Sequence, residues 1–148
     1  MAPFMEAVRE EWLDAYGHMN EGYYLVAFNN ACWPFLEQLG VGVEYFERTG
    51  CGLYTAESHL RFLKEVRAPA VLETRGMILG VDGKRVRCGF VTAVDGVERA
   101  TLESIYIHFD SKAGRATAMT EEVQNRLRTV QASELPSWAG RAISLERR

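Results

Sequence analysis

The sequence of 148 residues contains little of what marks several specialised classes of protein. Its three cysteines, Cys32, Cys51 and Cys88, are odd in number and widely spaced, which argues against a disulfide framework or a zinc site and fits reduced thiols in a cytosol. No apolar run approaches the roughly 20 residues that a helix needs to span a bilayer. We therefore expect a cytoplasmic protein that has no membrane partner.

The sequence also lacks an excess of positive charge. Its formal net charge is −3, which argues against non-specific binding to nucleic acid. The first residues, MAPFMEAVREEW, carry acidic side chains where a signal peptide would be basic and then apolar, so export is not expected. With 47% hydrophobic and 25% charged residues, the composition is that of a globular protein, and residues 1–148 are expected to form a single domain.

Several common catalytic motifs are missing as well. The sequence has no GxSxG elbow of a serine hydrolase, no GxGxxG or GxxxxGK(S/T) phosphate-binding loop and no HExxH metal motif. The three histidines, His18, His59 and His108, have no close second ligand along the chain. Neither a metal nor a cofactor is therefore expected.

What the sequence does contain is a polar loop that leads directly into a long apolar helix, between Trp12 and Leu39. Asn20 is a good N-cap because its side-chain oxygen can accept from first-turn amides, and Glu21 adds negative charge where the helix dipole favours it. Apolar residues recur at helical spacing on nearly every face, so the helix is expected inside the domain. Pro34 removes a backbone donor, so we expect a kink or an early end there.

The loop before this helix holds the candidate chemistry. Asp14, His18 and Asn20 fall within seven residues of one another. Amides at a helix start can hold a negative charge that develops on oxygen, and a carboxylate one turn upstream can act as base or nucleophile. The same residue types also fit a capped helix with a solvated loop, in which Asp14 and His18 only tie the turn together. Residue types alone leave both interpretations open.

After the helix, the hydrophobic period changes to the alternation that is typical of strands. Strands are expected over residues 53–62, 70–80, 85–94 and 97–110, with a helical turn at 43–48 and a first short strand at 7–12. Consecutive strands joined by short turns pair antiparallel, and the lack of crossover helices excludes a parallel βαβ fold. Thr120 is expected to cap an amphipathic surface helix over 120–132, and the tail from Ser133 has no clear periodicity.

The expected strand at 53–62 carries a second set of polar residues. Alternation places Tyr54, Ala56, Ser58, Leu60 and Phe62 on one face, and Thr55, Glu57, His59 and Arg61 on the other. Because the first face is apolar, the polar row must meet water, a partner subunit or a functional site. A row that only faces solvent is the alternative.

Four segments resemble a known family. The segment Asp-Ala-Tyr-Gly-His-Met-Asn at 14–20, followed by the apolar helix, resembles the D-x-x-G-H-(V/M)-N signature of hotdog-fold acyl-CoA thioesterases of the 4-hydroxybenzoyl-CoA type. Residues 54–60, 82–85 and 100–103 resemble the betainyl-CoA thioesterases of carnitine catabolism. The resemblance covers nearly the whole chain. It implies an α+β hotdog fold, in which a five- to six-stranded antiparallel sheet wraps a long central helix and a C-terminal helix lies on the surface.

The resemblance also implies an activity, the hydrolysis of a short or polar acyl-CoA, with betainyl-CoA as the specific candidate, to the free acid and CoA. No metal or prosthetic group is needed for this reaction. Asp14 matches the family's catalytic carboxylate, acting as nucleophile or as base for water. The amides around Glu21 and Gly22 match the groups that polarise the thioester carbonyl, and His18 and Asn20 match the fixed polar positions of the loop.

Proteins of this family work as dimers with sites at the subunit boundary, so the resemblance implies a homodimer or homotetramer. Glu57 and His59 would then face the neighbour's loop. If the acyl group carries trimethylammonium, aromatic rings can surround it through cation–π contacts. The candidate substrate-binding residues are Trp33, Tyr54, Thr55 and Phe62. Core packing is the alternative use of these rings, and Pro34 departs from the family's pattern in the lower half of the pocket.

Two other functions stay open at this point. A hotdog hydratase or dehydratase would use His59 and Glu57 across the dimer, which would leave Asp14 without a role. A non-enzymatic acyl-CoA-binding domain would keep the fold and use the pocket for affinity alone.

Overall fold

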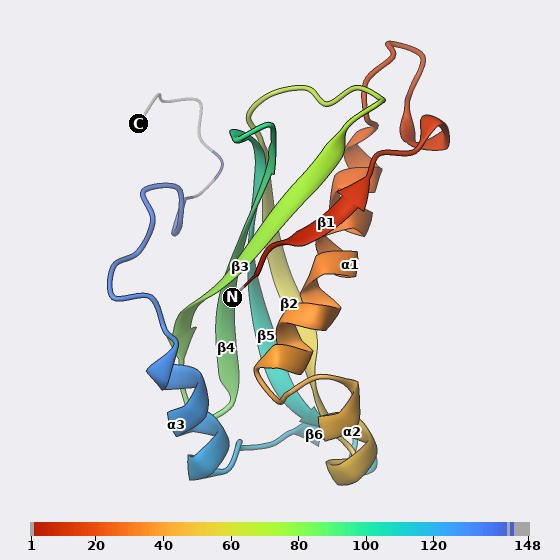
Figure 1. Cartoon of the computed structure of the whole chain (residues 1–148). Coiled ribbons are helices and arrows are strands. Elements are labelled where there is room, and N and C mark those ends of the chain that lie inside the picture. The colour runs from red at the N-terminus through yellow and green to blue at the C-terminus, as the bar shows by residue number, and fades with distance from the viewer. Residues whose placement is uncertain (1, 142, 144–148) are drawn as a thin grey trace.

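The computed structural model describes residues 2–141 and 143 of the chain. A curled sheet wraps one long helix, and two shorter helices lie at the same end of the molecule (Figure 1). The elements are β1 (Phe4–Ala7), η1 (Glu10–Trp12), α1 (Glu21–Gln38), α2 (Val43–Thr49), β2 (Cys51–Phe62), β3 (Val71–Val81), β4 (Arg85–Val94), β5 (Val97–Asp110), β6 (Arg115–Ala116) and α3 (Glu121–Thr129). No helix in this part of the chain is both long enough and apolar enough to cross a membrane.

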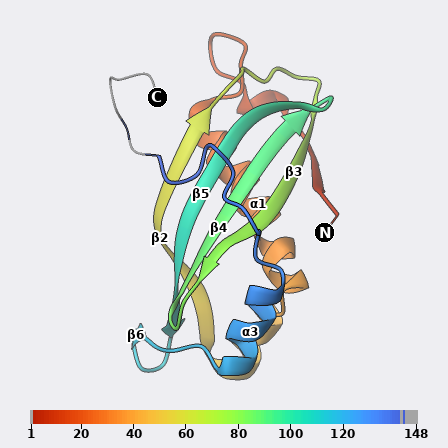
Figure 2. The same ribbon diagram turned by 90° about the vertical axis from the view of Figure 1, so that its left-hand side faces the viewer.

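The strands form one antiparallel sheet in the order β1-β3-β4-β5-β2, and β6 adds to β5. The face that α1 covers is called the inner face here, and the opposite face, which looks toward the viewer in Figure 2, is the outer face. β2 lies at one edge of the sheet. The predicted antiparallel sheet around a central helix is therefore confirmed, as is the C-terminal surface helix.

The helix α1 packs against β1 and β3 through a close approach to the sheet. A Cβ atom on Gly76 of β3 would lie only 2.6 Å from the ring of Phe35, so this glycine allows the helix to come near. Phe35 in turn meets Phe90 of β4 edge-on, with ring centroids 5.3 Å apart. Phe35 and Leu36 are both buried directly after Pro34, and this packing carries the helix on to Gln38. The predicted early end at Pro34 is wrong.

The other side of α1 is open. Leu25, Val26 and Trp33 are 47%, 43% and 51% exposed, although they belong to the most apolar helix of the chain. They lie over the part of the inner face that β2 and β5 form. The expectation of a helix buried on nearly all sides therefore holds for only one of its sides.

Other boundaries differ from the sequence-based expectations. The first strand is Phe4–Ala7 rather than 7–12, because these residues pair with β3 and the chain then turns into the 3-10 helix of residues 10–12. Thr120 caps α3 as expected, accepting from the amide of Val123 at 3.3 Å. The helix ends at Thr129 rather than near residue 132, and Val130 directly after it is exposed.

The segment after α3 crosses the outer face of the sheet (Figure 2). The amide of Ala132 donates to the carbonyl of Ile78 at 2.9 Å. Trp138 lies against Gly89 of β4, where a Cβ would be 2.6 Å from its ring. The amide of Gly140 donates to the Glu103 carboxylate at 2.7 Å. Residues 131–140, called the tail here, thus cover the middle of the outer face.

Candidate active site

The loop that precedes α1 is a tight, internally bonded turn. Leu13 and Met19 form an antiparallel bridge, and the amide of Asp14 donates to the carbonyl of His18 at 2.8 Å. The amide of Gly17 closes the turn on the carbonyl of Asp14 at 3.0 Å, and Gly17 has a φ of 73°, which favours glycine. The backbone therefore fixes where the Asp14 side chain starts.

The carboxylate of Asp14 is held on one side only. Its Oδ1 atom accepts from the amides of Tyr16 at 2.8 Å and His18 at 3.4 Å. In the described part of the chain, no side chain or amide donates to Oδ2. One oxygen thus sets the direction of the carboxylate, and the other is available to attack a carbonyl or take a proton.

The first turn of α1 follows directly on this loop. The side chain of Asn20 accepts from the amide of Gly22 at 3.0 Å, and its carbonyl accepts from the amide of Tyr23 at 3.0 Å. Among the hydrogen bonds of the described residues, the amide of Glu21 donates to no protein group. This N–H lies at the positive end of the helix dipole and can donate a hydrogen bond to the oxygen of a polarised carbonyl.

The loop is tied to the connection between β2 and β3. Nε2 of His18 lies 2.9 Å from a carboxylate oxygen of Glu65 and also contacts the guanidinium of Arg67. The amide of Met19 donates to the carbonyl of Val66 at 2.8 Å. We call these contacts of Glu65, Val66 and Arg67 the latch. The side chain of His18 therefore points to the latch, and only its backbone amide contacts the carboxylate of Asp14.

Two cavities follow the open side of α1, between the helix and β2. The first, called the hydroxyl pocket, has a volume of about 430 Å³ and begins at Gly22, next to the helix start. Its polar lining comes from α1, β2 and β5: Asn29, Cys32, Thr55, Ser58, Ser104 and Tyr106.

The hydroxyl pocket contains two pairs of hydrogen-bonded side chains. The hydroxyl oxygens of Ser58 and Ser104 are 2.8 Å apart, and Tyr106 Oη lies 3.3 Å from the sulfur of Cys32. Burial raises the pKa of the Tyr106 phenol far above its usual range and also raises the pKa of the Cys32 thiol. Both groups therefore stay protonated and neutral near pH 7.

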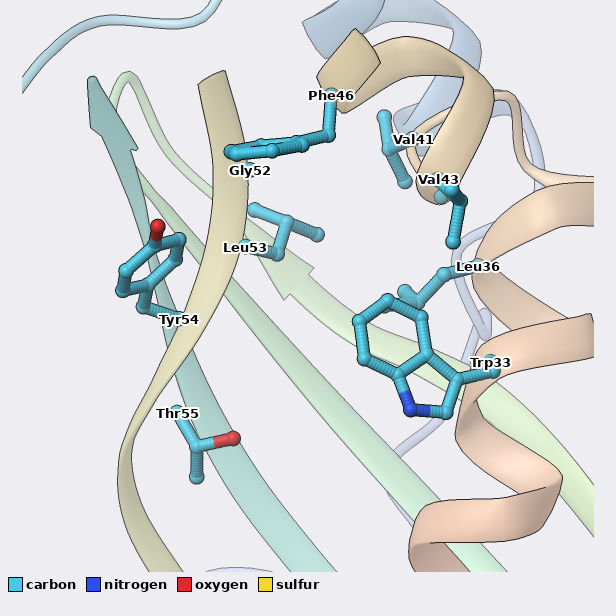
Figure 3. A pocket seen from close by; sticks show the side chains of 10 residues that line it. Trp33, Leu36, Val41, Val43, Phe46, Gly52, Leu53, Tyr54 and Thr55 are labelled. Carbon is cyan, nitrogen blue, oxygen red and sulfur yellow. The ribbon is translucent and has the colours of Figure 1, made fainter. Parts of the chain in front are cut away.

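The second cavity, called the aromatic pocket, has a volume of about 390 Å³ and lies toward the far end of α1. Figure 3 shows Trp33 and Phe46 directed into it from α1 and α2, with Leu53 of β2 opposite. Thr55 lines both cavities, so they are adjacent along β2. The residues described by the structure contain no cluster of three histidine, cysteine, aspartate or glutamate side chains that could hold a metal ion.

This fold and loop agree with a comparison of the sequence with known families. The model of the family described as the thioesterase-like superfamily matches residues 8–127. The chain belongs to the thioesterase-like superfamily. The family predicted from the sequence is thereby confirmed.

Members and structural neighbours of the superfamily match most of the chain. The L-carnitine dehydrogenase/betainyl-CoA thioesterase of Agrobacterium fabrum is 37% identical over 136 residues, which is 89% of this chain but 28% of that protein. The betainyl-CoA thioesterase of Pseudomonas aeruginosa is 30% identical over 144 residues, covering 93% of this chain and 91% of that protein. A Staphylococcus aureus protein in complex with CoA superposes with a TM-score of 0.87 at 21% identity, covering 97% of this chain and 94% of that chain.

The hotdog fold is the fold that this superfamily and its neighbours share. The chain spans less than a third of the two-function relative from Agrobacterium and nearly all of the single-function relative from Pseudomonas.

Within this fold, a β-bulge changes which residues of β2 face the helix. The register to β5 shifts between Thr55 and Glu57, so Ala56 is left without a partner. The residues opposite inner-face positions of β5 are Leu53, Thr55, Ser58, Leu60 and Phe62, and those opposite outer-face positions are Tyr54, Glu57, His59 and Arg61. The predicted alternation is wrong before the bulge, because the extra residue exchanges the two faces.

The three aromatic rings that were predicted to surround a trimethylammonium group therefore do not all line one cavity. The ring of Tyr54 stacks on Phe109 at 4.9 Å, on the side of β2 away from Trp33 (Figure 3). The ring of Phe62 meets Tyr24 edge-on at 5.2 Å. Trp33 points into the aromatic pocket beside Phe46, which has no prediction attached to it, and Tyr54 contributes to the lining of that pocket, whereas Phe62 does not.

The predicted polar pair of β2 also lies apart from the loop within one subunit. His59 pairs with Glu103 and Glu57 with Ile105, both at outer-face positions. The helix start and the hydroxyl pocket are on the inner face. The structure thus brings together Asp14, His18, Asn20, Glu21 and Gly22, and it adds the latch and the hydroxyls of Ser58, Ser104 and Tyr106, which no spacing along one segment would reveal.

Proposed function

We propose that the protein hydrolyses acyl-CoA thioesters at the start of α1. One observation carries this proposal: a carboxylate with one anchored oxygen and one free oxygen, at Asp14, precedes a helix whose Glu21 amide has no protein partner among the described residues. An acyl-transfer site needs this combination of base or nucleophile and oxyanion donor. Membership of the thioesterase-like superfamily supports the same reaction.

The reaction follows from these two groups. The thioester oxygen accepts a hydrogen bond from the Glu21 amide, which stabilises the negative charge that develops on it. Oδ2 of Asp14 either attacks the carbonyl carbon, giving an anhydride that water then hydrolyses, or takes a proton from an attacking water. In both routes the C–S bond breaks, CoA leaves as thiolate and is protonated, and the acyl group leaves as a carboxylate.

The proposed substrate is a CoA thioester of a short, polar acyl group, specifically betainyl-CoA. This assignment is supported by relatives named as betainyl-CoA thioesterases at 30% and 37% identity. It is also supported by the hydroxyl pocket, which starts at Gly22 and has polar side chains on its walls. A role in carnitine catabolism in the cytoplasm is part of the same proposal.

The protein is proposed to work as a homodimer that assembles through the edge of β2. Residues 54–58 of this edge strand are all exposed, and the exposed apolar residues Leu25, Val26 and Trp33 of α1 lie beside it. An unpaired strand edge next to an apolar surface pairs readily with another chain. A second copy of this chain would pair with the strand edge and cover the apolar surface. The hydratase alternative is not favoured, because Glu57 and His59 lie on the outer face.

The test is thiol release from a panel of acyl-CoA thioesters with purified protein. Release from betainyl-CoA above that from acetyl-CoA and butyryl-CoA is the expected result. Saturable binding of acyl-CoA without release would show a binding module instead. Release that is equal in wild type and Asp14→Asn would refute the assigned mechanism.

A further inference from the structure

Arg99 is the extra residue of a β-bulge near the start of β5. The register to β4 shifts between Thr92 and Ala93, which leaves Arg99 without a partner in that strand. A bulge changes the direction of the side chain of its extra residue. Nη1 of Arg99 donates to the carbonyl of Glu65 at 3.1 Å, so the guanidinium lies against the loop of residues 63–70 between β2 and β3.

The charge of Arg99 is not balanced by a carboxylate. Among the described residues, none of the ion pairs includes Arg99, and its side chain donates to one carbonyl oxygen only. Its Nε atom is buried and has no acceptor in the same part of the chain. A guanidinium carries five N–H groups, and leaving them without acceptors costs free energy. The half-buried Arg99 is therefore suited to a ligand with negatively charged oxygen atoms.

Arg99 and Arg67 line one cavity of about 210 Å³, which we call the arginine pocket, and Glu65 and Val66 lie in its wall. Glu65 is the carboxylate of this lining, and it already pairs with Arg67 at 3.0 Å and contacts His18 at 2.9 Å. The two guanidinium groups thus share one carboxylate. The arginine pocket has an excess of positive charge, and this excess resides on Arg99.

The arginine pocket lies close to the start of α1. The amide of Met19 donates to the carbonyl of Val66 at 2.8 Å. Burial raises the pKa of the phenol of Tyr24, near the start of α1, and the nearby positive charge of Arg99 acts against this rise. Glu21 follows Met19 by two residues. At about 3.8 Å per residue, these links place Nη1 of Arg99 no more than about 20 Å from the Glu21 amide.

A CoA thioester can span this distance. About 14 bonds separate the thioester carbonyl carbon from the first phosphorus of the diphosphate, and an extended chain gains roughly 1.2 Å per bond, so the two atoms can be about 16 Å apart. A hydrogen bond of about 3 Å at each end extends the reach to about 22 Å. The arginine pocket is inside this radius even at its upper limit of distance.

The basic residue at the other end of α1 is outside the same radius. Arg126 donates to the carbonyls of Leu39 and Gly40, directly after the helix. The 18 residues of α1 put these carbonyls about 27 Å along the helix axis from Glu21. Within one subunit, Arg126 therefore cannot bind the diphosphate of a thioester whose carbonyl is at the helix start.

We propose that the arginine pocket binds the diphosphate of the CoA substrate, and that Arg99 donates hydrogen bonds to its oxygen atoms. This inference rests on the proposed thioesterase function and names the part of the chain that holds the CoA half of the substrate. A planar guanidinium suits a phosphate because two of its N–H groups can donate to two oxygen atoms at once. Arg67 adds a second positive charge to the wall while it stays paired with Glu65.

The experiment compares betainyl-CoA with betainyl-pantetheine, which has the same acyl group and arm but no phosphate. If another acyl group of the panel is released faster, its CoA and pantetheine thioesters are used. Arg99→Met keeps the aliphatic stem and removes the charge, and Arg99→Lys keeps the charge but not the planar fork. The matched control is Arg75→Met, because Arg75 is an exposed arginine of β3 that pairs with Glu73 and does not line the arginine pocket.

We expect Arg99→Met to lower kcat/KM for the CoA thioester about ten- to hundredfold, mainly through KM, because hydrogen bonds to a charged group are lost. The same variant should hydrolyse the pantetheine thioester within about twofold of the wild type, which would also show that it is folded. Arg99→Lys should lie between the two, and Arg75→Met should match the wild type with both substrates. If Arg99→Met does not fold, Arg99→Lys decides, because its loss should also be confined to the CoA thioester.

Three outcomes would overturn the inference. Equal losses with both thioesters would show that Arg99 only fastens the loop to β5. No loss with either would place the diphosphate elsewhere. The thioester of 3′-dephospho-CoA separates the phosphates: a loss in Arg99→Met that persists with it supports the diphosphate, and a loss that disappears would assign Arg99 to the 3′-phosphate instead.

The hydrolase function can fail separately. No release of thiol from any acyl-CoA or acyl-pantetheine would refute that function. Calorimetric titration of CoA into the wild type and Arg99→Met would then still test the arginine pocket, with binding at least about tenfold weaker in the variant as the expected result. Equal affinities would overturn the inference.

Discussion

The two ends of α1 use polar groups in opposite ways. At its start, the amide of Glu21 and one oxygen of Asp14 are left without protein partners in the described part of the chain. Beyond its far end, Oη of Tyr45 in α2 bonds Nε2 of His108 in β5 at 2.9 Å, and Nδ1 of His108 bonds the carbonyl of Thr117 at 3.0 Å. The far end satisfies its buried groups and contributes stability, whereas the start keeps groups free for chemistry. Substitutions at the two ends should therefore affect different measurements.

The largest effect is expected for Asp14→Asn. The amide keeps the size and the Oδ1 hydrogen bonds of the carboxylate but cannot act as base or nucleophile, so kcat should fall by at least about a hundredfold. The midpoint of thermal unfolding should stay close to that of the wild type. Steady-state thiol release and calorimetry measure the two quantities.

The matched control for this change is Asp82→Asn in the turn between β3 and β4. Asp82 also accepts from two loop amides, those of Lys84 at 2.9 Å and Arg85 at 2.7 Å, but its second oxygen binds the guanidinium of Arg85. This hydrogen bond lowers the pKa of Asp82. Asp82→Asn should leave kcat unchanged, and a comparable loss of kcat in both variants would show that loop order rather than charge is responsible.

At the far end, Tyr45→Phe should act on stability alone. The change removes the partner of a buried ring nitrogen of His108, which is 2% exposed, and leaving such a group unsatisfied costs about 1–3 kcal/mol. Urea denaturation should show the loss in the free energy of unfolding, while kcat stays within about twofold. A loss of kcat without a loss of stability would contradict the division between the two ends.

Asn20→Ala should affect both measurements, because its side chain caps the helix that carries the Glu21 amide. The lost cap costs about 1 kcal/mol of unfolding free energy. It also releases the first turn, so kcat should fall. Asn20→Asp, which keeps a capping oxygen, should restore stability and kcat together, and recovery of only one of them would separate the cap from the orientation of the amide.

The smallest effect is expected from the latch. Glu65→Gln removes the charge that holds His18, and an exposed pair of this kind is worth about 0–1 kcal/mol, so kcat should fall by up to roughly fivefold with KM unchanged. Glu73→Gln is the control, because Glu73 forms an ion pair with Arg75 two positions along the chain, as Glu65 does with Arg67, but lies in β3 away from the loop. If the two variants have equal kcat and KM values, the latch does not help to position Asp14.

Much of this arrangement could be predicted from the sequence, because it depends on local patterns. The cap at Asn20, the carboxylate at Asp14 and the alternating strands are encoded within a few residues, and the structure has the cap, the loop and the strands where those patterns indicate them. The motif at residues 14–20 indicated the family, and the family model that matches residues 8–127 shows it.

The remaining features depend on pairing between distant segments. The bulge at Ala56 exists only relative to β5, so alternation within β2 could not reveal that Tyr54 and Ser58 face opposite ways. The contact of His18 with Glu65 joins segments 47 positions apart, and the tail contacts β4 and β5 without any periodicity of its own. Both require the register of the folded sheet.

Because of the tail, the outer face of the sheet and its β2 edge differ in whether another copy of the molecule can add to them. With Trp138 seated at Gly89 and Gly140 bonded to Glu103, the middle of the outer face is occupied by the chain itself. A second sheet cannot stack there without displacing these contacts. Copies of the molecule that join through β2 would extend the sheet in its own plane, so that the assembly becomes wider and not thicker.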